Sequence, residues 1–132
     1  MKLAIAATFL LAIATPIAAQ KATPAITAAL ADPSRPADHR PRDATRKPAE
    51  LLAFAGIKPG QKVADFIMGG GYWTRILSPL VGTKGKVYAY QPDEFIKFRA
   101  AYADEQKTAV AGLSNTVALS ESLGAVNFPE KL

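Results

Sequence analysis

The sequence predicts an α/β domain built on a parallel β-sheet, and three observations lead to this fold class. Segments with strand and helix character alternate along residues 62–119, as a parallel sheet with right-handed crossovers requires. Apolar residues recur at helical spacing over residues 73–81, which indicates an amphipathic helix. Three consecutive glycines at positions 69–71 separate this helix from the strand before it. We expect about three strands in all.

The start of the chain predicts a secretory signal peptide over residues 1–19. Lys2 precedes an apolar run over residues 3–14, and small residues lead up to Ala19, after which we place the cleavage site. The run of about a dozen residues is too short for a membrane span, which needs roughly 20. We therefore expect a periplasmic or secreted mature chain with no stable membrane span.

Composition narrows the kinds of site that the chain can hold. The 132 residues include no cysteine, which excludes disulfides and thiolate metal sites. The net charge of +5 is modest and by itself indicates no nucleic-acid partner. The single histidine, His39, lies among Arg and Pro residues, so we expect a solvated loop histidine and no metal site.

Residues 20–47 form a lead-in rich in Ala, Pro, Arg and Asp. Its prolines would interrupt any long helix, so we expect an extended segment with short helical pieces. The basic residues of this lead-in are Arg35, Arg40, Arg42, Arg46 and Lys47. Acids are interleaved with them and no aromatic side chain is present to stack on a base. The lead-in is therefore expected to be a solvated surface segment that binds no nucleic acid.

The domain itself is expected over residues 48–132. Pro48 suits the first turn of a helix that runs to Phe54 and is ended by Gly56. The short, apolar and partly β-branched segment 62–67 has the character of a buried strand.

The remaining elements follow the glycines in order. Trp73 lies on the apolar face of the helix over residues 73–81, where we expect it in the core. A second strand is expected at residues 86–90. Two acids suit the start of a helix over residues 93–102, and a weaker strand signal follows at residues 116–119.

The glycine loop carries the predicted chemistry. Glycine lets a backbone approach a ligand closely, and unpaired N–H groups at a helix N-terminus face a polar or anionic group. A dinucleotide site would place its glycine motif directly after the strand, whereas here Asp65 precedes Gly69 by four residues. A tight connection between strand and helix with no ligand stays open as an alternative.

Residues 63–74 resemble the first motif of the class I S-adenosylmethionine-dependent methyltransferases. That motif has an acid at the strand end and glycines two, four and six positions later, often with a Thr beyond them. The residues that match this pattern are Asp65, Gly69, Gly71 and Thr74. Ile67 stands where the family has its first glycine.

The resemblance covers roughly residues 42–120 and, with the leader, extends to a group of predicted exported methyltransferases of bacteria. It implies a Rossmann-like three-layer sheet of the class I methyltransferase type and the cofactor S-adenosyl-L-methionine. That fold has more strands than this chain supplies. We therefore expect the N-terminal part of such a domain, either as a fragment or as a prematurely terminated reading frame.

The resemblance also implies a cofactor site. The residues expected to form it are Asp65, Gly69, Gly70, Gly71 and Gln91. The glycine backbones would approach the amino-acid end of the cofactor, while Asp65 would organise the loop and reach the ammonium. Gln91 stands where the family usually has an acid for the ribose hydroxyls. Because a neutral amide binds hydroxyls more weakly than a carboxylate, cofactor affinity should be lower unless Asp93 or Glu94 substitutes.

The leading functional hypothesis is methyl transfer from S-adenosylmethionine to an acceptor that the sequence does not identify. The alternatives are a non-catalytic or truncated periplasmic cofactor-binding remnant and an NAD(P)-dependent oxidoreductase. Asp65 and the glycine spacing disfavour the oxidoreductase. No catalytic residue is assigned, since the part of such a domain that supplies the acceptor pocket would follow Leu132. An exported enzyme would also need a source of a cofactor that is made in the cytoplasm.

Overall fold

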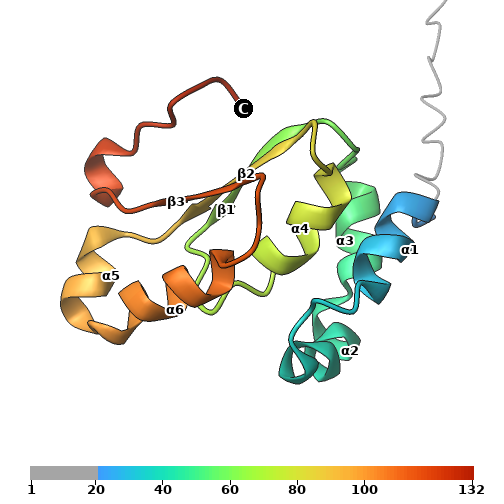
Figure 1. Ribbon diagram of the computed structural model, residues 1–132, viewed down its shortest axis with the longest axis horizontal. Coiled ribbons are helices and arrows are strands. Elements are labelled where there is room, and N and C mark those ends of the chain that lie inside the picture. Colours follow the sequence, from blue (N-terminus) through green and yellow to red (C-terminus); the bar gives the residue numbers. More distant parts are fainter. Residues whose placement is uncertain (1–20) are drawn as a thin grey trace, which may run out of the picture.

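The computed structural model describes residues 21–132, so the predicted signal peptide and its cleavage site lie outside the described part. A parallel three-stranded sheet carries helices on its flank (Figure 1). This confirms the predicted α/β class, as a partial Rossmann-like fold of the methyltransferase type. Among residues 21–132, no helix combines the length and the apolar character that crossing a membrane requires.

The sheet contains β1 (Lys62–Phe66), β2 (Lys86–Tyr90) and β3 (Thr116–Leu119), with β2 in the middle. All neighbours are parallel, and Asp65 of β1 lies opposite Ala89 of β2. The three predicted strands are confirmed almost to the residue. Because parallel strands end at one edge of a sheet, the segments that follow β1, β2 and β3 meet there.

Three helices pack together on one side of the molecule: α1 (Pro24–Ala31), α3 (Pro48–Phe54) and α4 (Thr74–Val81), and of these α4 contacts β1 and β2. The apolar face of α4 is buried against β2, and its Ile76 is fully enclosed. The two residues of α4 that are not buried, Arg75 and Pro79, lie one turn apart on the other side of the helix. α1 lies against both α3 and α4, so the lead-in contributes to the core.

The prediction of one helix over residues 93–102 is wrong. The structure has two helices, α5 (Asp93–Phe98) and α6 (Ala101–Val110), because Arg99 between them is extended at φ −142° and ψ 100°. No Gly or Pro marks this break in the sequence.

The side chain of Gln106 fixes α6 against the sheet. Its Nε2 donates to the backbone oxygens of Ala89 and Leu119, each at 2.9 Å. Its Oε1 accepts from Ser120 Oγ at 3.0 Å. These bonds satisfy backbone oxygens at the ends of β2 and β3 and hold α6 against this edge of the sheet.

The two faces of the sheet have different cover. Val87 and Ala89 of β2 pack against the helices, whereas Tyr88 and Tyr90 point to the other face. There the C-terminal segment folds back over the sheet (Figure 1), with Phe128 against both tyrosine rings. The cover is partial, because Phe66 on this face remains 52% exposed.

The lead-in contains a 3-10 helix (Ala37–Arg42, η1) and α2 (Asp43–Arg46) besides α1, as predicted for short helical pieces. The prediction of a solvated segment is confirmed for Arg40, Arg42, Arg46 and Lys47, which are exposed, and is wrong for Arg35. Arg35 is only 3% exposed, because its guanidinium binds Asp43 and the backbone oxygen of Leu30. The charge of Arg35 indicated solvent exposure. In the structure, hydrogen bonds to Asp43 and to the backbone oxygen of Leu30 satisfy the buried guanidinium.

Candidate ligand-binding site at the glycine loop

The loop between β1 and α4 follows an unusual backbone path. Ile67, Gly69 and Gly71 have positive φ angles of 62°, 52° and 77°. A left-handed conformation is strained for a β-branched residue and easy for glycine. Ile67 therefore occupies a position that favours glycine, which is also where the resembled motif has its first glycine.

The glycines of the loop serve two purposes. A Cβ on Gly71 would lie 2.4 Å from the Cβ of Ala109, so this glycine allows α6 to pack against the loop. A Cβ on Gly69 or Gly70 would meet nothing within 4 Å. Internal packing explains Gly71, whereas Gly69 and Gly70 border open space that a ligand can enter.

Asp65 ties the end of β1 to the first turn of α4. Its Oδ2 accepts from the backbone N–H of Thr74 at 2.8 Å and from Thr74 Oγ1 at 2.6 Å. Burial raises the pKa of this carboxyl, and the two bonds from Thr74 oppose that effect. Within residues 21–132 its Oδ1 makes no hydrogen bond and can accept one from a ligand.

Gln91 is fully buried directly after β2 and turns toward the loop. Its Oε1 accepts from the backbone N–H of Gly69 at 3.0 Å, and its Nε2 has no partner in the described chain. The oxygen expected at the ribose is thus committed to the loop. Contact between Gln91 and a cofactor remains a prediction.

The two acids that follow Gln91 differ in their availability. Glu94 accepts from Ser122 Oγ at 2.5 Å and from the backbone N–H of Leu123 at 3.1 Å, so it fixes the segment after β3. The carboxylate of Asp93 makes no hydrogen bond or ion pair with residues 21–132. Asp93 is therefore the acid at the end of β2 that is free to bind hydroxyl groups.

The lead-in is fastened to the glycine loop through Tyr72. Its hydroxyl donates to Asp43 Oδ1 at 2.6 Å, and Asp43 pairs with Arg35 at 2.8 Å. Burial and the neighbouring carboxylate raise the pKa of Tyr72 to about 12. The guanidinium of Arg46 lies 4.7 Å from the centre of the Tyr72 ring. Sequence reasoning missed this cluster, whose only signal was the interleaving of Arg and Asp.

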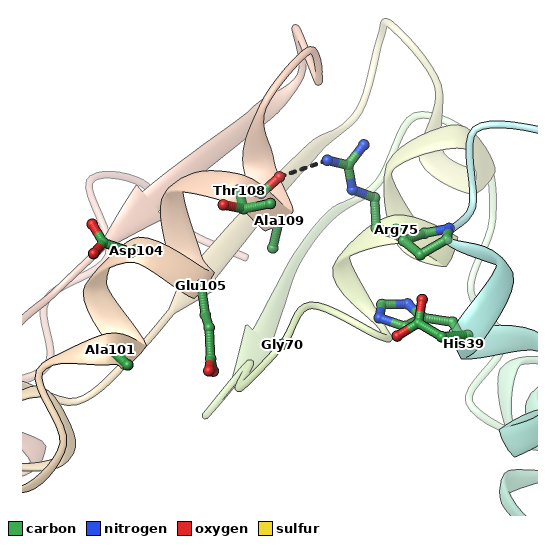
Figure 2. A pocket seen from close by; sticks show the side chains of 10 residues that line it. His39, Gly70, Arg75, Ala101, Asp104, Glu105, Thr108 and Ala109 are labelled. Atoms are coloured by element: carbon green, nitrogen blue, oxygen red, sulfur yellow. Dashed lines mark hydrogen bonds between the residues drawn. The ribbon is translucent and has the colours of Figure 1, made fainter.

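A cavity of about 450 Å³ opens beside Gly70, between the lead-in and α6 (Figure 2). His39 projects into it from η1 and is only 6% exposed, so the prediction of a solvated histidine is wrong. Burial lowers the pKa of His39, with the nearby Arg42 acting in the same direction and Asp38 opposing it. The centroids of the His39 and Tyr72 rings are 5.8 Å apart, so Tyr72 contributes to the burial of His39.

Among residues 21–132 there is no cluster of three or more His, Asp and Glu side chains that could hold a metal ion. The polar side chains near the loop include those of Asp65, Gln91, His39 and Arg75. Such a set suits hydrogen bonding to an organic ligand.

No protein-family model matches the chain, and no curated protein matches it. The chain is similar to a solved structure described as a SAM dependent methyltransferase from Aquifex aeolicus, with 32% sequence identity and a TM-score of 0.52. The similarity covers 79% of this chain and 49% of that one, so the chain spans about half the length of that protein. This likeness supports the methyltransferase class.

Proposed function

We propose that this chain supplies the cofactor-binding half of an S-adenosylmethionine-dependent methyltransferase. The observation that carries the proposal is the open space over Gly69 and Gly70, directly beside the buried Asp65 at the end of β1. A ligand can approach the loop backbone there. The similarity to a methyltransferase of known structure agrees with this reading.

The residues present fit S-adenosylmethionine in part. The backbone at Gly69 and Gly70 would take the amino-acid end, and Oδ1 of Asp65 would accept from its ammonium group. Asp93, in place of Gln91, would accept from the ribose hydroxyls. When bound, the cofactor supplies an electrophilic methyl group. The contribution of this chain is to hold and orient the reactants.

Binding of S-adenosylhomocysteine, measured by isothermal titration calorimetry on the purified mature chain, tests this proposal. We expect saturable binding that weakens about tenfold, or about 1.4 kcal/mol, in Asp93→Asn. Glu50→Gln on the exposed side of α3 is the control with the same charge change. Binding of NADH without S-adenosylhomocysteine would contradict the proposal.

A non-catalytic cofactor-binding protein is the second candidate, because the ribose position carries a buried glutamine. Incubation with cofactor labelled on its methyl group and an extract of the native cells separates the two candidates. Transfer of label to any acceptor supports the enzyme. Tight S-adenosylhomocysteine binding without transfer supports the non-catalytic protein.

We also propose that the protein is exported to the periplasm or the medium, with cleavage after Ala19. The basis is the charged start, apolar run and small-residue exit of residues 1–19. Fractionation of native cells with intact-mass analysis tests this proposal. A mature chain that begins at Gln20 is expected outside the cytoplasm, and a cytoplasmic chain that retains Met1 would contradict export.

A further inference from the structure

Arg46, the last residue of α2, brings a positive charge from the lead-in to the glycine loop. Its guanidinium lies over the ring of Tyr72, 4.7 Å from the ring centre, and Tyr72 directly follows Gly71. The side chain of Arg46 makes no hydrogen bond or ion pair with residues 21–132. Arginine stacks on an aromatic face while its N–H donors stay free to bind a second group. Arg46 can therefore offer these donors to a ligand at the loop.

The ring beneath Arg46 is held in place by buried contacts. Tyr72 is 3% exposed, and its hydroxyl donates to Asp43 Oδ1 at 2.6 Å. Asp43 also accepts from the buried guanidinium of Arg35 at 2.8 Å. A side chain that is already ordered by stacking on a fixed ring loses less conformational entropy when it binds a ligand. The cluster thus prepares Arg46 for binding.

Asp65 supplies the opposite charge beside Arg46. Burial raises the pKa of the Asp65 carboxyl, whereas the bonds from Thr74 and the positive charge of Arg46 lower it. Oδ1 of Asp65 makes no hydrogen bond with residues 21–132. The space over Gly69 and Gly70 is open. The loop therefore has one carboxylate and one guanidinium near it, each with atoms left to bind a ligand.

This pair of opposite charges selects the chemistry of the ligand. A phosphate would be attracted by Arg46 and repelled by Asp65, and a simple amine would meet the reverse situation. A zwitterionic amino-acid group suits both residues, because its ammonium can donate to the carboxylate while its carboxylate accepts from the guanidinium. The planar fork of N–H donors in arginine matches the two oxygens of a carboxylate.

We propose that Arg46 binds the carboxylate of the cofactor's amino-acid end, while Asp65 accepts from the ammonium group of the same end. The inference rests on the proposed function and adds to it a residue of the lead-in. Arg46 then determines specificity, because it favours a ligand with a complete amino-acid end over a nucleoside that lacks the carboxylate.

Calorimetric titration of the purified mature chain with two compounds tests this inference. S-adenosylhomocysteine carries both charged groups of the amino-acid end, whereas its decarboxylated analogue keeps the ammonium and lacks the carboxylate. We expect Arg46→Met to weaken binding of S-adenosylhomocysteine about tenfold and to change binding of the analogue less than about twofold. Arg46→Lys keeps the charge without the planar fork, and its affinity for S-adenosylhomocysteine should lie between those two.

Arg42→Met is the matched control, since it removes the same charge from another exposed arginine of the lead-in and should change neither affinity. Equal losses for the two compounds in Arg46→Met, or an unchanged affinity for S-adenosylhomocysteine, would overturn this inference alone. If the unsubstituted chain binds neither compound, the proposed function is overturned and this inference with it.

Discussion

Oε1 of Gln91 accepts a hydrogen bond from the backbone N–H of Gly69 at 3.0 Å, which joins the end of β2 to the glycine loop after β1. The bond satisfies a loop donor that would otherwise face a ligand. Gln91 is thus a structural support of the loop.

Replacing Gln91 by Met should destabilise the protein by about 1–3 kcal/mol, because the N–H of Gly69 would lose its partner in a partly buried setting. Urea denaturation measures this change. Gln61→Met is the matched control, since the exposed Gln61 makes a comparable bond from its Oε1 to the N–H of Lys58 at 2.8 Å. Equal losses for the two variants would show that burial of Gln91 adds nothing.

Ile67→Gly should leave the free energy of unfolding unchanged or raise it by up to about 1 kcal/mol. Relief of the left-handed strain, about 1–2 kcal/mol, outweighs the added backbone entropy of glycine, about 0.5–1 kcal/mol. Phe66→Gly, at the preceding strand position, should lower stability because no positive φ is relieved there. Thermal unfolding of both variants checks the contrast, and a marked loss in Ile67→Gly would contradict the strain argument.

Arg35→Met should lower the free energy of unfolding by about 1.5–3 kcal/mol, since it removes the charged hydrogen bonds between the buried guanidinium and the partly exposed Asp43. Lys107→Met removes an exposed ion pair with Asp104 and should cost less than about 1 kcal/mol. Chemical denaturation compares the two. If Arg35→Met does not fold, Tyr72→Phe still tests the cluster, with an expected loss of about 1.5–3 kcal/mol for a bond to a charged group.

The burial of His39 makes stability depend on pH below neutrality. Its folded pKa is lowered, so the unfolded chain binds more protons between the folded value and about 6.5. Above about pH 6.5 the neutral His39 leaves the free energy of unfolding undiminished. That free energy falls as the pH is lowered from there toward the folded pKa of His39. His39→Gln should remove this slope, because the chain has one histidine. Parallel pH profiles for the two proteins would contradict the assignment.

Much of the fold was predictable because its signals are local. The alternation of strand and helix patterns, the amphipathic spacing of α4 and the acid before the glycines lie within short windows of sequence. The three strands and the helices α3 and α4 therefore followed from residues close to one another. The motif with Asp65 also predicted a ligand at the glycine loop, and this stays a prediction.

Only the tertiary structure decided which of these residues are available to a ligand. Gln91 faces the loop, Gly71 packs on α6, and Arg35 and His39 are buried by partners far away in the sequence. Local pattern reports the backbone preference of a segment, whereas the exposure of a polar side chain depends on partners that only the folded chain brings within hydrogen-bonding distance.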